Sequence, residues 1–278
     1  MASDNRFAVL IDADNVSVKY IKIILDEISK DGIATYKRIY GDWTNPSLIS
    51  WKSVLLDNSI NPIQQYSYTT GKNSTDSAMI IDAMDILYSG KVDGFCLVSS
   101  DSDFTRLAAR LRESGMTVIG MGESKTPNSF IAACNKFKYL DILSAADEEE
   151  PEEAPAPKPE PAKKAAPQKK APQKKAAAAK KAKEEPKRQQ QEEIEEPRTS
   201  LRTIRRALRT IVRENSDEDD WIIIGKIGNL LDKRYPDFDV RNFGFSKLTP
   251  FLESLDMFEI RDMKKDGNSS PQKYVRLK

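Results

Sequence analysis

A long segment without aromatic residues constrains the fold of this 278-residue chain more than any other feature of its sequence. No Phe, Trp or Tyr occurs between Tyr139 and Trp221, and residues 145–198 consist mainly of Pro, Ala, Lys, Glu and Gln. Such a composition cannot bury enough apolar surface to offset the entropy lost on folding. We therefore predict two folded domains, residues 1–144 and 199–278, joined by a disordered linker.

The net charge of the linker changes sign along its length. It is acidic at 147–153, basic at 158–188 and acidic again at 192–196. It can serve as a solvated spacer, or as an arm that contacts phosphates without reading a base sequence. The two roles are compatible.

Strand and helix patterns alternate in the first domain. Residues 7–11 are a continuous apolar run, as expected of a parallel strand that is buried on both faces. Further strands are expected near 34–40, 62–68, 95–98 and 116–121, with helices near 17–30, 46–57, 76–88, 104–114 and 128–136, the last closing the domain. This alternation predicts an α/β fold with an open parallel sheet and right-handed crossovers.

The chain contains no histidine, which excludes nucleophile–histidine pairs and histidine zinc sites. Its two cysteines, Cys96 and Cys134, lie in apolar surroundings and are expected to be buried, reduced thiols.

No apolar run approaches the roughly 20 residues that span a bilayer. The N-terminus does not resemble a secretory signal. We therefore expect a cytoplasmic protein whose chemistry, if it is an enzyme, depends on carboxylates, lysines or hydroxyls.

Aspartates follow two of the predicted strands. Asp12 and Asp14 come after the first strand, and Asp101 and Asp103 come after the strand at 95–98. Ligands collect at the carboxyl ends of strands in open α/β sheets, so these side chains converge if the two strands are neighbours. Asp76, at the start of the helix near 76–88, can join them.

A single aspartate after a strand is more often a helix N-cap than a metal ligand, but paired clusters at two strand ends are harder to explain by capping. Carboxylates this close repel one another unless a cation holds them together, and hard oxygen ligands select Mg²⁺ or Mn²⁺. Such ions can activate water and polarise a phosphodiester without histidine. Asp82 and Asp85, farther along the Asp76 helix, are expected to be solvated or structural.

Three segments of the first domain resemble the signature blocks of the NYN domain family, within the PIN-like nuclease superfamily. They are residues 11–15, 72–82 and 99–104, and the resemblance covers about residues 6–143. It implies a Rossmann-like, PIN-type fold and RNA cleavage that depends on Mg²⁺ or Mn²⁺. Carried over residue by residue, it implies the following site: Asp12, Asp76, Asp101 and Asp103 as catalytic metal ligands, Asn15 as a supporting polar residue, and Lys72 as an RNA contact. Residues 73–76 read Asn-Ser-Thr-Asp where relatives often have Lys-Gly-Val-Asp, so the metal ligand is retained while substrate contacts in this loop can differ.

The C-terminal domain combines helical patterns near 199–214, 223–234 and 245–255 with a hairpin between 257–263 and 272–277, which suggests a winged-helix module. Residues 238–255 are similar to the core of the LOTUS (OST-HTH) domain, which implies RNA binding. Basic side chains on the first helix and on the hairpin are candidate phosphate contacts, although a solvated face is the simpler interpretation: Arg202, Arg205, Arg206, Arg209, Arg213, Lys264, Lys265 and Lys273. Phe243 and Phe245 are expected in the core.

Together these patterns predict a metal-dependent endoribonuclease whose C-terminal domain recruits RNA. Two alternatives remain open at this point. One is an RNA-binding or scaffold protein with weak or no catalysis. The other is a phosphatase that resembles the haloacid dehalogenases, with Asp12 as its nucleophile.

Overall fold

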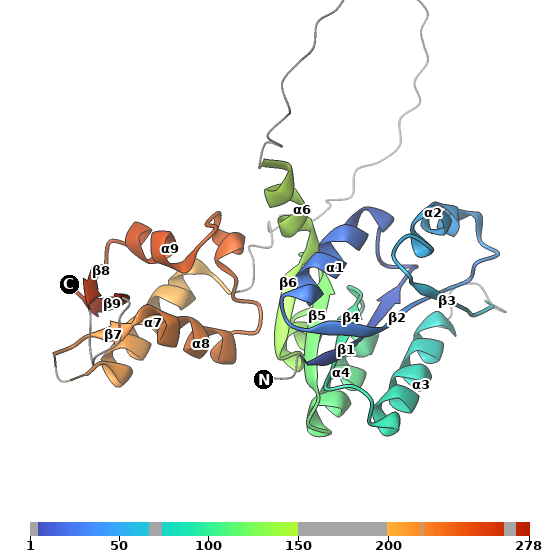
Figure 1. Cartoon of the computed structure of the whole chain (residues 1–278), viewed down its shortest axis with the longest axis horizontal. Coiled ribbons are helices and arrows are strands. Elements are labelled where there is room, and N and C mark those ends of the chain that lie inside the picture. The colour runs from blue at the N-terminus through green and yellow to red at the C-terminus, as the bar shows by residue number, and fades with distance from the viewer. Residues whose placement is uncertain (1–4, 67–73, 150–198, 218, 264–270) are drawn as a thin grey trace, which may run out of the picture. The chain divides into compact units, whose positions relative to one another are not determined.

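The computed structural model of the chain describes residues 5–66, 74–149, 199–217, 219–263 and 271–278 (Figure 1). The N-terminal domain alternates strands with helices, as the sequence predicts. Its elements are β1 (Arg6–Asp12), η1 (Val18–Tyr20), α1 (Ile21–Ser29), β2 (Ile33–Gly41), η2 (Pro46–Trp51), α2 (Lys52–Leu55), β3 (Asn61–Gln64), α3 (Ser74–Ser89), β4 (Gly94–Val98), η3 (Ser102–Phe104), α4 (Thr105–Glu113), β5 (Thr117–Gly122), α5 (Asn128–Ala133), β6 (Lys136–Tyr139) and α6 (Leu140–Glu149).

The six strands form one parallel sheet in the order β3-β2-β1-β4-β5-β6 (Figure 1). The central strand β1 is buried on both faces, and its residues alternate between two cores. Val9 and Ile11 pack with α1 and α6, whereas Ala8 and Leu10 pack with α3, α4 and α5. Each face of the sheet is thus covered by helices, which explains why the strand reads as an uninterrupted apolar run. The predicted Rossmann-like α/β fold is confirmed.

The expected helix at 128–136 is wrong in its second half, because α5 ends at Ala133 and a sixth strand and a sixth helix follow. The strand β6 has only four residues, with Phe137 and Tyr139 buried on one side. Period-two alternation over so few residues cannot be separated from a helix end in the sequence alone. The strand exists because it pairs with β5.

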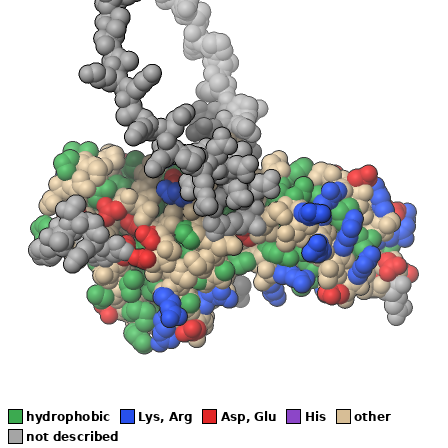
Figure 2. Space-filling view, turned by 180° about the vertical axis from the view of Figure 1, so that it is seen from behind, with side chains coloured by type: hydrophobic (Ala, Val, Ile, Leu, Met, Phe, Trp, Pro, Cys, Tyr) green, Lys and Arg blue, Asp and Glu red, His purple; other side chains and the backbone are tan. Residues whose placement is uncertain are grey.

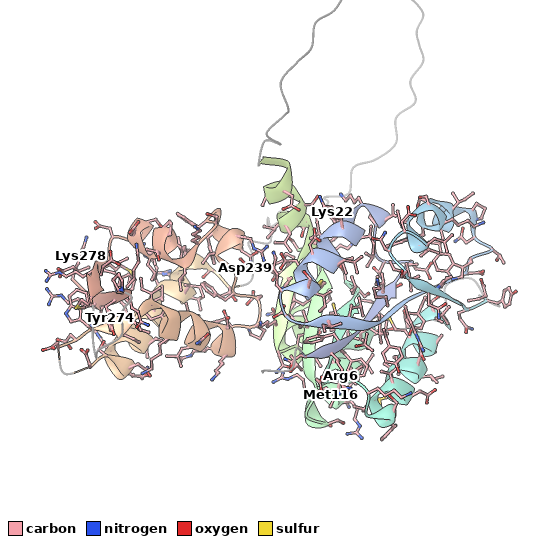
Figure 3. All side chains as sticks on the ribbon, viewed as in Figure 1. Arg6, Lys22, Met116, Asp239, Tyr274 and Lys278 are labelled. Atoms are coloured by element: carbon pink, nitrogen blue, oxygen red, sulfur yellow. The ribbon has the colours of Figure 1, made fainter. Side chains whose placement is uncertain are left out.

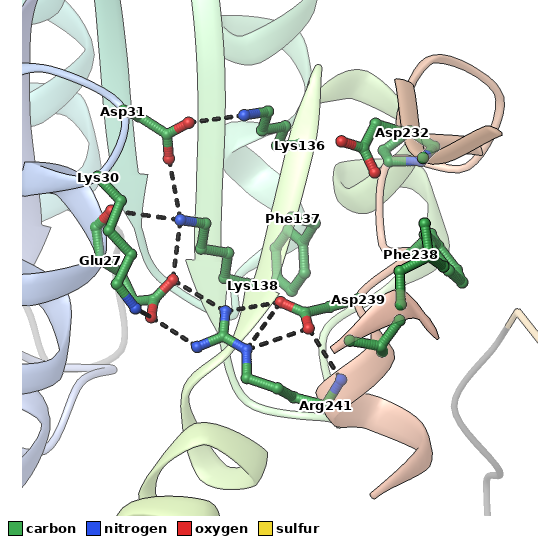
Figure 4. Close-up of a pocket in the computed structure, with 14 residues that line it drawn as sticks. Glu27, Lys30, Asp31, Lys136, Phe137, Lys138, Asp232, Phe238, Asp239 and Arg241 are labelled. Atoms are coloured by element: carbon green, nitrogen blue, oxygen red, sulfur yellow. Dashed lines mark hydrogen bonds and ion pairs between the residues drawn. The ribbon is translucent and has the colours of Figure 1, made fainter. Parts of the chain in front are cut away.

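Charged side chains tie this edge strand to α1 and to the turn that follows it (Figure 4). The Nζ atom of Lys138 lies 2.9 Å from carboxylate oxygens of both Glu27 and Asp31, and the Nζ atom of Lys136 lies 2.6 Å from Asp31. Burial alone would lower the pKa of Lys138, but the two carboxylates raise it. The lysines of β6 therefore stabilise the sheet edge through ion pairs with Glu27 of α1 and with Asp31, which follows that helix.

The C-terminal domain has a core of its own, formed by residues between 204 and 277. Its elements are α7 (Leu201–Asn215), β7 (Ile222–Ile223), α8 (Ile224–Arg234), η4 (Val240–Phe243), α9 (Leu248–Ser254), β8 (Phe258–Met263) and β9 (Gln272–Leu277). The three strands form an antiparallel sheet in the order β7-β9-β8. Helices followed by a small sheet confirm the winged-helix prediction.

The rings of Phe243 and Phe251 stack at 5.3 Å, and Phe245 meets Phe251 edge-on at 5.5 Å. Phe243 and Phe245 therefore pack against the core, as expected, and do not form an exposed stacking platform. The hairpin turn with Lys264 and Lys265 lies outside the described residues. Among the described helices, none is long and apolar enough to cross a membrane.

Candidate metal centre

The strand order reverses between β1 and β4. From β1 the chain proceeds outward through β2 and β3, and from β4 it proceeds outward on the other side through β5 and β6. Ligands of doubly wound sheets bind at this switch point, outside the carboxyl ends of the strands. Both predicted aspartate clusters lie here, because Asp12 ends β1 and Asp101 follows β4. The labels of Arg6 and Met116 in Figure 3 mark the opposite edge, where β1 and β5 begin.

Asp12 is held rigidly by its neighbours. Its side chain is only 1% exposed. One carboxylate oxygen accepts a hydrogen bond from the backbone N–H of Asp14 at 3.1 Å, and the other accepts one from Ser99 Oγ at 2.9 Å. Burial raises the pKa of Asp12, and hydrogen bonds from Ser99, Asn15 and the Asp14 amide partly offset that effect. Asn15 thus supports Asp12 directly.

The loop after β4 presents the second pair of aspartates. The Asp101 amide donates to Ser99 Oγ at 3.1 Å, and Asp101 Oδ1 accepts from the Asp103 amide at 2.9 Å. Asp101 is therefore the N-cap of η3, and the carboxylate that caps this segment is also a candidate metal ligand. Gly122 lets β5 approach this loop closely, since a Cβ atom there would lie 2.7 Å from the Ser99 carbonyl oxygen.

Asp76 reaches the same place from the first turn of α3. The preceding residue, Thr75, donates a hydrogen bond from Oγ1 to Asp14 Oδ2 at 2.9 Å, which ties the start of the helix to the loop after β1. Burial, followed by the charges of Asp12, Asp101, Asp103 and Asp14, raises the pKa of Asp76 to about 6. This raised pKa reflects the burial of Asp76 first and the repulsion from the neighbouring aspartates second.

Three of the four predicted ligands come together as one group. Asp76, Asp101 and Asp103 each offer a carboxylate oxygen, and these oxygens all lie within 4.8 Å of one another. Asp12, the fourth predicted ligand, is not in this group, although its charge raises the pKa of Asp76 more than that of any other neighbouring aspartate. Figure 2 shows acidic side chains gathered on the surface of the N-terminal domain. A donor set made only of carboxylate oxygens fits a hard divalent cation such as Mg²⁺ or Mn²⁺.

Sequence reasoning missed the hydroxyl groups that organise these carboxylates. Ser99 is fully buried and links the β4 loop to Asp12, and Thr75 links α3 to Asp14. The only signal in the sequence is their position directly beside the predicted aspartates. Lys72, the predicted RNA contact, lies outside the described residues.

The predicted arginine stripe lies on the exposed side of α7, opposite Ile204, Leu208 and Ile211. Arg205 differs from the others because its Nη2 atom donates to the carbonyl oxygen of Leu255, at the end of α9, at 2.8 Å. The remaining arginines of the stripe are exposed and available to a ligand: Arg202, Arg206, Arg209 and Arg213. Lys and Arg side chains are numerous on the visible face of this domain (Figure 2).

The fold and the acidic cluster define a doubly wound α/β domain with a carboxylate site at its switch point. Comparison with known families identifies the two domains: residues 6–141 match the NYN domain, and residues 198–269 match the OST-HTH/LOTUS domain. The chain therefore carries an NYN domain, of the PIN-like nuclease superfamily, followed by a LOTUS domain, as the sequence motifs indicate.

None of the curated proteins compared with the chain matches it. Among solved structures, a protein of unknown function from Vibrio parahaemolyticus is similar. It is 18% identical, and the match covers 51% of this chain and 96% of that one, with a TM-score of 0.43.

Proposed function

We propose that this protein is a metal-dependent endoribonuclease, with its reaction centre at Asp76, Asp101 and Asp103 and with RNA recruited by the C-terminal domain. The observation that carries the proposal is the convergence of these three carboxylates, within 4.8 Å, at the switch point of an NYN domain. The LOTUS domain and the exposed arginines of α7 support RNA as the substrate.

In this proposal each acidic residue has a defined task. Asp76, Asp101 and Asp103 would hold a Mg²⁺ or Mn²⁺ ion, which when bound polarises the scissile phosphate and lowers the pKa of the attacking water. Asp12 keeps negative charge behind the ligands, and Ser99 orients both Asp12 and the Asp101 loop. Asn15 supports Asp12 through a side-chain hydrogen bond.

The same geometry argues against the phosphatase alternative. A nucleophilic aspartate needs a carboxylate oxygen that is free to attack the substrate. Both oxygens of Asp12 accept hydrogen bonds within the protein, and the side chain is almost fully buried. Failure to trap a phosphorylated Asp12 with small phosphate esters is the result that our proposal expects.

The test uses purified full-length protein and a covalently closed, circular single-stranded RNA, which only an endonuclease can open. We expect cleavage with Mn²⁺ and none with a chelator. Asp101→Asn and Asp103→Asn should each lower kcat/KM by about 100-fold or more, because each removes a charge from the cation site. Asp85→Asn is the matched control, since Asp85 is exposed on α3.

RNA binding, measured on the same variants without metal, separates the remaining alternative. If RNA is bound but the circle is never opened under any metal condition, the protein is an RNA-binding scaffold. If Asp101→Asn and Asp103→Asn cleave as fast as the unaltered protein, the reaction centre lies elsewhere.

A further inference from the structure

A second polar cluster joins α3 to β2, on the side of the helix that faces the sheet. It consists of Arg38 and Tyr40 on β2 and Asp82 on α3. One carboxylate oxygen of Asp82 pairs with Arg38 Nη1, and the other accepts a hydrogen bond from the hydroxyl of Tyr40. Both oxygens of Asp82 are thereby engaged in contacts within the domain.

These contacts are shielded from solvent. Tyr40 is fully buried, and the side chains of Arg38 and Asp82 are 26% and 20% exposed. Burial, followed by the hydrogen bond to Asp82, raises the pKa of Tyr40, so the phenol stays protonated and donates. The Arg38 guanidinium also lies over the Tyr36 ring, 5.2 Å from its centroid. Charge-assisted hydrogen bonds in such surroundings fix geometry more firmly than the same contacts in water.

The cluster is connected to the metal centre through the backbone. Tyr40 pairs with Asp12 in the register of β1 and β2, and its carbonyl oxygen accepts the Ala13 amide at 2.9 Å. Asp82 follows Asp76 by six residues in the same helix, a rise of about 9 Å along the axis. The helix that carries Asp76 is thus bonded in its middle to the residue that stands beside Asp12.

The first turn of α3 is attached to the β1 loop through the hydrogen bond from Thr75 to Asp14. Farther along, Met79 and Ala83 hold the helix in the core, and the two-oxygen contact of Asp82 adds a directional polar attachment to β2. The position of Asp76 relative to Asp101 and Asp103 therefore depends on both attachments.

We propose that Asp82 is a positioning residue for the metal centre: by binding Arg38 and Tyr40 it sets where α3 lies on the sheet, and so holds Asp76 at ligand distance from Asp101 and Asp103. The inference rests on the proposed function, because it assigns Asp82 a task in the same site. Asp82 itself contacts neither the cation nor the RNA in this assignment.

The test compares Asp82→Asn with Asp85→Asn in the full-length protein. Asn at position 82 keeps the shape of the side chain but no longer carries the charge that Arg38 binds. Asp85 lies one turn farther on the exposed side of the same helix and controls for loss of a negative charge near the site. Tyr40→Phe removes only the hydroxyl contact and serves if Asp82→Asn fails to fold.

Two readouts are needed. Mn²⁺ binding, followed by water-proton relaxation without RNA, should weaken roughly 5- to 20-fold in Asp82→Asn, about 1 to 1.8 kcal/mol, and hardly change in Asp85→Asn. Cleavage measured against Mn²⁺ concentration should show the same shift in the half-saturating concentration, with most of the rate recovered at saturating Mn²⁺. A purely structural role would instead lower the amount of folded, active protein and leave the half-saturating Mn²⁺ concentration unchanged.

The outcomes separate the two proposals. If the unaltered protein binds Mn²⁺ and cleaves RNA while Asp82→Asn matches Asp85→Asn in both readouts, the positioning role is wrong and the nuclease proposal stands. If the unaltered protein neither binds Mn²⁺ nor cleaves, the proposed function fails and the role of Asp82 fails with it.

Discussion

At the scale of single residues, Asp76 is subject to two opposing requirements, cation binding and stability of the fold. Its place in the acidic cluster makes it a suitable cation ligand, whereas burial and the same acidic neighbours make its ionised form unfavourable in the metal-free protein. Functional sites commonly reduce the stability of a fold in this way. The motifs in the sequence were sufficient to predict Asp76, Asp101 and Asp103 as a group. The buried bridging hydroxyls could not be predicted, because serine and threonine beside an aspartate have many other uses.

Asp76→Asn should stabilise the metal-free protein at neutral pH. The carboxyl pKa rises from 3.8 in the unfolded chain to about 6 in the folded one, so the folded state holds the proton more tightly. Its contribution to stability is present below pH 3.8 and is lost as the pH rises through about 6. Since Asn carries no charge, we expect the variant to match the unaltered protein near pH 3.8.

At pH 7 the Asp76→Asn variant should unfold with a free energy higher by roughly 1 kcal/mol, less than the full shift implies, because solvent screens a partly exposed group. Denaturant unfolding in chelator across this pH range measures the difference. A difference independent of pH would show that repulsion at Asp76 is not its source.

At the scale of elements, the sequence predicted best those segments that are buried on both faces or show a long helical period. The strands β1 and β4 have continuous apolar runs, and α7 has a complete apolar stripe. Short elements that depend on a neighbour were missed: β6 forms against β5, and the two-residue β7 forms against β9. The expected helix at 46–57 begins as the 3-10 segment η2, for which residue periodicity carries little signal, and continues as the short helix α2.

The exposed face of α7 leads to a prediction about salt dependence. Arg206→Ala together with Arg209→Ala should flatten the slope of log affinity against log salt by about 1.4, if each arginine meets one phosphate of single-stranded RNA. Arg205→Ala should instead lower the stability of the domain by roughly 1 kcal/mol, because it frees the Leu255 carbonyl oxygen. Fluorescence anisotropy at several salt concentrations and denaturant unfolding distinguish the two effects. Equal salt slopes for the double variant and the unaltered protein would contradict the assignment.

At the scale of the whole molecule, the two folded domains have separate cores that share no residue. The proposed division of labour follows from this independence, because the acidic cluster lies wholly in the first domain and the arginine stripe wholly in the second. The domain order could be predicted from composition and motifs, because the aromatic-free segment separates two parts of the chain whose strand and helix patterns differ.

A shortened protein, residues 1–149, should still cleave RNA with Mn²⁺. We expect kcat within roughly threefold of the full chain and KM higher by about tenfold or more, because the phosphate contacts of the second domain are lost while the chemistry is retained. Steady-state cleavage of the same circular RNA by both proteins measures this split. An unchanged KM would mean that the LOTUS domain does not recruit this substrate.

The acidic residues of the proposed metal centre come from three distant segments, with Asp12 at the end of β1, Asp76 at the start of α3, and Asp101 and Asp103 in the loop after β4. Domains fold as units during synthesis. A nascent chain therefore has no complete site until residues beyond Asp103 have left the ribosome and β4 has paired with β1. If the protein is the nuclease proposed here, it is harmless to its own messenger and to the ribosomal RNA around it for most of its translation. Activity begins only when the sheet is assembled.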